Sequence, residues 1–182
     1  MADDRAPRAD AARNRARILT IARVAFAVEG PDVPLDEIAR RAGVGAGTVH
    51  RHFPTKRDLL AAVVVDRLEG LAARAEELRD AADPVEAFFL FLRELTAEAR
   101  ENIVLTTAIG ESLGETAEAA AELSRGLGLL LDRAQRTGGV KGEVSVVDIH
   151  AILNGVIVME RGLPYGARGL GLDVVIDGLR SR

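Results

Sequence analysis

The side chains with the clearest chemical potential lie in the run AGTVHRHFPTK, residues 46–56, where Arg, His and Lys recur beside small residues. A guanidinium can engage guanine O6 and N7 together, so Arg51 is the best candidate for reading a base. Ala46 and Thr48 can pack on a thymine methyl, and Gly47 lets the backbone come close to the bases. This combination of residue types suits the major groove of duplex DNA.

Other cations of the N-terminal third are better suited to the phosphate backbone. Lys56 lies at the start of an expected helix, whose free N–H groups also favour an anion. Taken singly, each cation could be a solvated surface residue, but the outer side of the expected helix carries no large apolar residue that would need burial. We expect phosphate contacts from His50, His52, Lys56, Arg13 and Arg17.

The elements that must position these side chains are encoded between Leu35 and Leu60. Apolar residues at helical spacing predict a short helix that packs inward, and Gly43 permits the positive φ that ends it. Val49 and Phe53 would share the inner face of a second short helix of about residues 45–52, which leaves Gly47 and Arg51 outside. Thr55 and Asp58 have the spacing of a capping box and predict the start of a longer helix. This order is that of a helix-turn-helix.

The same segment resembles the DNA-binding domain of the tetracycline-repressor (TetR) family, whose recurrent string is IA..AGV..GT[LV]Y.HF..K..LL. The matching residues are Ile38, Ala39, Ala42, Gly43, Val44, Gly47, Thr48, Val49, His52, Phe53, Lys56, Leu59 and Leu60. Gly45 replaces the usual Ser or Thr, and His50 the usual Tyr. The resemblance implies an all-α protein in which an N-terminal three-helix helix-turn-helix domain precedes a C-terminal helical domain for ligand binding and dimerisation. It also implies a homodimer with two reading helices about 34 to 36 Å apart on a palindromic double-stranded DNA operator.

Charge is distributed unevenly along the 182 residues. Residues 1–57 hold 11 basic and 7 acidic side chains, so this part has a net charge of +4, whereas the remainder has −8. A positive module on a negative body orients a protein on a polyanion. The chain has no cysteine and no apolar run of membrane-spanning length, and its first residues lack the apolar core of a signal peptide. We therefore expect a cytoplasmic protein without membrane association.

Turn and capping signals divide the chain into a flexible tail (1–10), the helix-turn-helix domain (11–57) and a second helical domain (58–182). In the second domain, Asp83 and Pro84 open one helix, and further helices are expected over 103–113 and 115–135. Ser145 and Asp148 form another capping box, which opens a helix whose apolar residues surround most of its circumference and predict burial. The segment LDVVIDGL predicts a last short amphipathic helix.

The second domain is expected to hold a small apolar or amphipathic effector in an apolar pocket with a few polar contacts. Aromatic residues are more often core than ligand contacts, so this is the less specific of the two site predictions. The residues Ala120, Ser124, Gly128 and Leu131 share one seam, whose three small members would permit close helix approach, and we expect a dimer there. The candidate ligand contacts are Phe88, Phe89, Leu92, Thr106, Thr107, Glu111, His150 and Asn154.

Competing functions find little support in the sequence. The glycines at 43, 45 and 47 form GxGxG after a helical segment, which does not match a dinucleotide site. His50 and His52 point in nearly opposite directions on a helix, so we expect no metal or other cofactor, and no nucleophile motif suggests an enzyme. The favoured interpretation is a repressor released from DNA by a small molecule. Two alternatives stay open: a helical protein-interaction module of the same fold with little specific DNA binding, and a small-molecule enzyme in the second domain.

Overall fold

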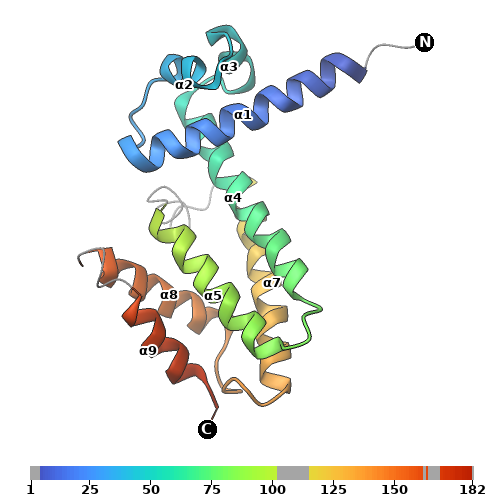
Figure 1. Cartoon of the computed structure of the whole chain (residues 1–182), viewed down its shortest axis with the longest axis vertical. Coiled ribbons are helices and arrows are strands. Elements are labelled where there is room, and N and C mark those ends of the chain that lie inside the picture. Colours follow the sequence, from blue (N-terminus) through green and yellow to red (C-terminus); the bar gives the residue numbers. More distant parts are fainter. Residues whose placement is uncertain (1–4, 102–114, 162, 164–168, 182) are drawn as a thin grey trace. The chain divides into compact units, whose positions relative to one another are not determined.

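The computed structural model describes residues 5–101, 115–161, 163 and 169–181, and the regular elements within these residues are all helices (Figure 1). They are α1 (Arg5–Glu29), α2 (Leu35–Ala42), α3 (Ala46–His52), α4 (Lys56–Leu78), α5 (Pro84–Glu101), α7 (Glu115–Arg136), α8 (Val146–Arg161) and α9 (Leu170–Leu179). The predicted all-α class is confirmed. The helix expected over 103–113 lies outside the described residues. No helix in the described part of the chain is long and apolar enough to cross a membrane.

The chain folds as two compact units that share α4. Unit 1 contains α1, α2, α3 and the first half of α4 as far as Arg67, and unit 2 begins at Leu68 and contains α5, α7, α8 and α9. The boundary therefore falls inside a helix, ten residues later than the one that the sequence suggested between 57 and 58. A continuous helix carries no turn or linker signal that could mark such a boundary.

Unit 1 is built around the inner faces of its helices. α1 contributes Ile18, Ala22 and Phe26 to the core, and α3 contributes Val49, which is fully buried. α1 begins at Arg5, so residues 5–10, which the sequence analysis assigned to a flexible tail, are helical. Alanine and arginine are strong helix formers, and a proline is tolerated in the first turn, so the helix can extend through this segment.

Unit 2 packs around α5, which contacts α7 and α8, while α8 also contacts α9. Asp83 caps α5, because its Oδ1 accepts hydrogen bonds from the N–H groups of Val85 and Glu86 at 3.0 Å each. The predicted capping box of α8 is also present: Ser145 N–H donates to Asp148 Oδ2 at 2.9 Å, and Asp148 N–H donates to Ser145 Oγ at 3.2 Å. Local sequence signals thus define where these helices begin.

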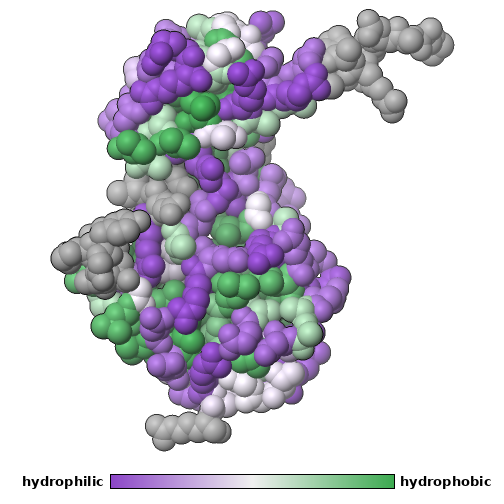
Figure 2. All heavy atoms as spheres, viewed as in Figure 1, coloured by the Kyte–Doolittle hydropathy of each residue, from purple (hydrophilic) through white to green (hydrophobic). Residues whose placement is uncertain are grey.

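α8 is buried on one side only, so the prediction of burial around most of its circumference is wrong for the single chain. Ile149, Leu153 and Ile157 are buried, whereas Val147 is 75% exposed and Val158 is 64% exposed. The neighbouring helices α5, α7 and α9 cover the face of α8 that carries the buried residues. The second face stays apolar and open, and in Figure 2 apolar surface is visible over α8 and α9.

α9 is fixed to the rest of unit 2 at both ends. At its start, Gly169 N–H donates to Oε1 of the buried Glu160 at 3.0 Å, and Glu160 also pairs with Arg100 of α5. At its end, Lys141 N–H donates to the carbonyl of Leu179 at 3.0 Å, and Arg180 forms an isolated antiparallel bridge with Val140. The chain between α7 and α8 therefore holds the C-terminal residues in place.

Candidate nucleic-acid interface

The turn between α2 and α3 has the geometry that the sequence predicts. Gly43 adopts φ 64° and ψ 36°, a left-handed conformation that glycine reaches without a Cβ clash. Val44 N–H donates to the carbonyl of Ala39 at 3.1 Å, which closes the end of α2. Gly45 is extended, and its carbonyl accepts from Thr48 N–H at 2.8 Å. The chain is thereby redirected, and α3 begins at Ala46 without a side-chain cap.

α3 presents small and basic residues outward and apolar residues inward. Val49 is fully buried, and Phe53 at the C-terminal end is 2% exposed. Arg51 is exposed, and its Nε donates to the carbonyl of Gly47 at 3.0 Å, so that its side chain lies along the helix surface. We call the outward residues of α3 the reading face; they are Ala46, Gly47, Thr48, His50 and Arg51.

The two histidines of α3 have different surroundings. His50 is 51% exposed, and its Nε2 lies 3.4 Å from Oδ1 of Asp36 at the start of α2. His52 is half-buried, and its ring lies tilted against that of Phe53, with 6.1 Å between the centroids. The structure thus gives His52 a packing contact, and the phosphate contact expected of it stays a prediction.

The start of α4 follows α3 closely in the sequence and carries Lys56, another residue that we expect to contact phosphate. Thr55 and Asp58 form the predicted capping box: Thr55 N–H donates to Asp58 Oδ2 at 2.9 Å, and Asp58 N–H donates to Thr55 Oγ1 at 3.2 Å. Lys56 is the first residue of the helix. Its Nζ lies 3.3 Å from Oδ1 of Asp32, which belongs to the loop between α1 and α2.

α1 brings further arginines to unit 1. The guanidinium of Arg17 reaches the α2–α3 turn, since a Cβ placed on Gly43 would lie 3.1 Å from Arg17 Nη2. Arg13 pairs with Asp10 on the exposed surface of the same helix. The sequence analysis missed Arg15, whose guanidinium lies 5.5 Å from the centroid of the Phe53 ring. The run RNRAR contained this residue, but only the tertiary structure shows which arginine reaches α3.

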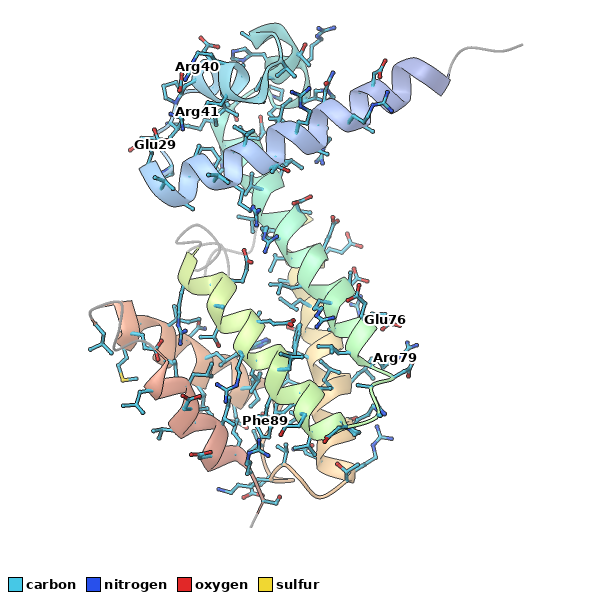
Figure 3. All side chains as sticks on the ribbon, in the orientation of Figure 1. Glu29, Arg40, Arg41, Glu76, Arg79 and Phe89 are labelled. Atoms are coloured by element: carbon cyan, nitrogen blue, oxygen red, sulfur yellow. The ribbon has the colours of Figure 1, made fainter. Side chains whose placement is uncertain are left out.

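Two other arginines of unit 1 have a structural role. Glu37 accepts hydrogen bonds from Arg40 and Arg41 of its own helix, and Arg41 also reaches Glu29 at the end of α1 (Figure 3). The hydrogen bond from Arg40, with a second contribution from Arg41, lowers the pKa of Glu37 to about 2. The hydrogen bond from Arg41 likewise lowers the pKa of Glu29. This network ties α1 to α2 and holds the helix-turn-helix together.

In unit 2, the predicted effector contacts divide into three groups. Phe88, Leu92 and Phe89, which Figure 3 labels, are fully buried in the core. The guanidinium carbon of Arg180 lies 4.5 Å from the centroid of the Phe89 ring. His150 is half-buried on α8, where burial lowers its pKa, and Asn154 is exposed one turn later. The remaining three, Thr106, Thr107 and Glu111, lie outside the described residues.

A surface groove of unit 2 runs between α4 and α7, with a volume of about 380 Å³. It is lined by side chains that include Glu69, Glu76, Glu122 and Leu129, and it contains none of the predicted effector contacts. The described residues hold no group of three or more His, Asp or Glu side chains that could bind a metal ion. Among the described residues, the outward face of α3 in unit 1 is therefore the best candidate for a functional site.

Two family patterns match this chain. Residues 18–63 match the family described as bacterial regulatory proteins, tetR family, and residues 83–181 match the C-terminal domain described as transcriptional regulator SbtR-like. The first match contains α2, α3 and the predicted DNA contacts Arg51 and Lys56. The second covers more than half of the chain and most of unit 2.

Individual relatives agree with these matches. The HTH-type transcriptional repressor KstR of Rhodococcus jostii is 33% identical over 127 residues, which are 68% of this chain and 59% of that protein. The TetR transcription regulatory protein of Mycobacterium vanbaalenii, known from a crystal structure, is 45% identical, with a TM-score of 0.74 and coverage of 95% of this chain and 98% of that one. A transcriptional regulator of Saccharomonospora viridis, solved in complex with choline, has the same fold at 18% identity, with a TM-score of 0.73 and coverage of 94% and 100%.

Proposed function

The chain belongs to the TetR family of bacterial transcriptional regulators, and from this membership and the geometry of α3 we propose that it is a DNA-binding repressor. In this proposal, the reading face enters the major groove of an operator. Arg51 reads a base, and Thr48 and Ala46 contact base edges or methyl groups. His50, His52, Lys56, Arg13 and Arg17 contact phosphate and fix the register.

The observation that carries the proposal is the combination of outward small and basic residues with inward apolar residues on one short helix. Val49 and Phe53 anchor α3 in the core, so the reading face is exposed without cost to packing. The hydrogen bond from Arg51 to the carbonyl of Gly47 holds the guanidinium on the helix surface. Its remaining donors can turn toward a guanine once DNA approaches.

Selection of bound fragments from random duplex DNA tests this function. We expect one palindromic motif, and binding to it should weaken steeply with salt because phosphate contacts release counterions. Arg51→Ala should weaken binding by about tenfold for each reading helix and relax the preference at one position of each half-site. Arg125→Ala, which removes an exposed arginine from α7 in unit 2, is the matched control and should leave binding unchanged. Enrichment of the same motif with equal strength by Arg51→Ala would refute the assignment.

The open apolar face of unit 2 supports a homodimer. Val147 and Val158 on α8, and Leu170 and Val174 on α9, are exposed by 64% to 75%. On α8 the residues 147, 151, 154 and 158 follow the spacing of one helix face, so Asn154 lies on the same face. A second copy of the chain would cover this surface and place two reading helices on one operator. On α7, Leu131 is buried within the single chain, and a Cβ on Gly128 would lie 3.4 Å from Val146 Cγ2, so the part of the predicted seam in the dimer stays a prediction.

The release of DNA by a small apolar or amphipathic effector completes the proposal. An effector that binds one conformation of unit 2 more tightly than another shifts the population toward the conformation that it prefers. DNA is released if the reading helices are wrongly spaced in that conformation. The proposed contacts of the effector are Phe88, Phe89, Leu92, Thr106, Thr107, Glu111, His150 and Asn154. Screening small molecules for loss of operator binding tests the idea, and a compound that releases the wild-type protein should lose its effect when a contacting residue is substituted.

A further inference from the structure

Two exposed carboxylates lie next to two of the side chains proposed to bind phosphate. Asp36 lies 3.4 Å from His50 and has 77% of its side chain exposed, and Asp32 lies 3.3 Å from Lys56 and is 99% exposed. His50 and Lys56 are themselves half-exposed, with 51% and 42% of their side chains accessible to solvent. Each pair therefore sits in water, where a DNA phosphate could replace the carboxylate.

The acidic residues of unit 1 differ in what their contacts do for the fold. Glu29 and Glu37 are held by Arg41 in the network that joins α1 to α2. Asp36 lies in the first turn of α2, where negative charge is favourable, but that benefit does not require a contact with α3. Asp32 follows Pro31 in the turn after α1, where aspartate is a common residue, but this position does not require a contact with Lys56 either. The contacts of these two aspartates with His50 and Lys56 are therefore additional to their local roles in unit 1.

Building on the proposed function, we propose that Asp32 and Asp36 limit the affinity of the protein for duplex DNA. In the free protein, Asp32 lies beside Lys56 and Asp36 lies beside His50, and when DNA approaches the two carboxylates repel the phosphates that must take their place. Phosphates carry no sequence information, so the effect is the same on any duplex. The two aspartates thus weaken the binding of unit 1 to DNA of any sequence. Tight binding to an operator then depends on the base contacts and on both reading helices of a dimer.

The size of the effect follows from the exposure of the pairs. Exposed ion pairs contribute little, because water and salt screen them, and the repulsion of a neighbouring phosphate is of similar size. We expect each substitution to strengthen DNA binding about two- to fivefold for each reading helix. In a dimer with both helices bound, the factors for the two helices multiply.

The test compares Asp32→Asn, Asp36→Asn and the double variant with the wild-type full-length protein. The probes are a 30-base-pair random-sequence duplex and the duplex selected from random DNA, and fluorescence anisotropy gives Kd at several salt concentrations. Asp132→Asn is the matched control, because Asp132 is an exposed carboxylate on α7 whose Oδ2 lies 3.8 Å from Arg136 Nη2. It removes the same charge from unit 2, and thermal unfolding shows whether each variant is folded.

We expect all three aspartate variants to strengthen binding, each by the same factor on the random duplex as on the selected duplex, and the gain should shrink as salt rises. The selected motif should stay the same, and Asp132→Asn should change nothing. Unchanged or weaker binding by folded variants would overturn the inference, and so would an altered motif, since a carboxylate that reads cytosine N4 would produce one. Failure of the proposed function would look different, because the wild-type protein and all three variants would then bind no duplex even at low salt.

Discussion

Two glycines four residues apart should respond in opposite ways to the same substitution. Gly43 has φ +64°, and a left-handed conformation costs an L-residue about 1 to 2 kcal/mol. Gly47 lies within α3, and a Cβ there would meet nothing within 4 Å. Alanine is favoured over glycine in a helix by about 0.5 to 1 kcal/mol. Gly43→Ala should therefore destabilise unit 1 while Gly47→Ala stabilises it, and the two variants should differ by about 1.5 to 3 kcal/mol.

Urea denaturation of the full-length protein, followed by far-UV circular dichroism, measures this difference as a shift of the midpoint. DNA binding separates stability from recognition. Gly47→Ala adds a methyl group to the reading face, so this variant should bind the selected duplex more weakly although it is more stable. Gly43→Ala also meets Arg17 Nη2 at 3.1 Å, but that flexible guanidinium can move away at little cost.

Three results would refute this reasoning. Wild-type stability of Gly43→Ala would mean that the α2–α3 turn does not need a left-handed residue. A loss of stability in Gly47→Ala would mean that the space outside α3 is not open. A stabilised Gly47→Ala protein with undiminished DNA binding would mean that position 47 does not approach the duplex.

Four further outcomes are expected. Because its pKa is lowered to about 2, Glu37 stabilises the protein above pH 4.5, and this contribution is lost as the pH falls from 4.5 toward about 2. Glu37→Gln should therefore lower the Tm at pH 7, and the Tm difference from the wild-type protein should vanish between pH 4.5 and about 2. Burial lowers the pKa of His150, so its protonation destabilises the fold below pH 6.5; His150→Gln should reduce this acid sensitivity, and an NMR titration of the wild-type imidazole should give a pKa below 6.5. Gly139→Ala should lower the Tm by several degrees in a thermal melt, because its Cβ would lie 2.3 Å from Val85 Cγ2. Val158→Asp should yield monomers in analytical ultracentrifugation and weaken operator binding, whereas persistent dimers would contradict the proposed interface.

The sequence predicts those features that depend on residues near one another in the chain. The capping boxes at Thr55 and Ser145, the cap at Asp83 and the left-handed Gly43 are all confirmed, because each depends on contacts within a few residues. The outward position of Arg51 also follows from the sequence, since the apolar spacing of one turn of helix fixes which side is buried.

Features that depend on tertiary contacts were beyond prediction. Asp36 and His50 are 14 positions apart and meet only because α2 packs on α3. The apolar circumference of α8 is compatible both with burial inside one chain and with burial against a second copy, so the sequence pattern could not separate its two faces. The α7 seam shows the same ambiguity, because small residues such as Gly128 permit close approach without specifying the partner.

The double attachment of α9 has a consequence for how the protein opens. The end of a helix that no other segment holds ordinarily frays, and its amide hydrogens then exchange quickly with solvent. Here the carbonyl of Leu179 and the Val140–Arg180 bridge join the last turn to residues that precede α8. The amides of this turn should therefore exchange as slowly as those of the interior, and removing the residues from Arg180 onward would free the helix at one end and expose the Phe89 ring that Arg180 covers.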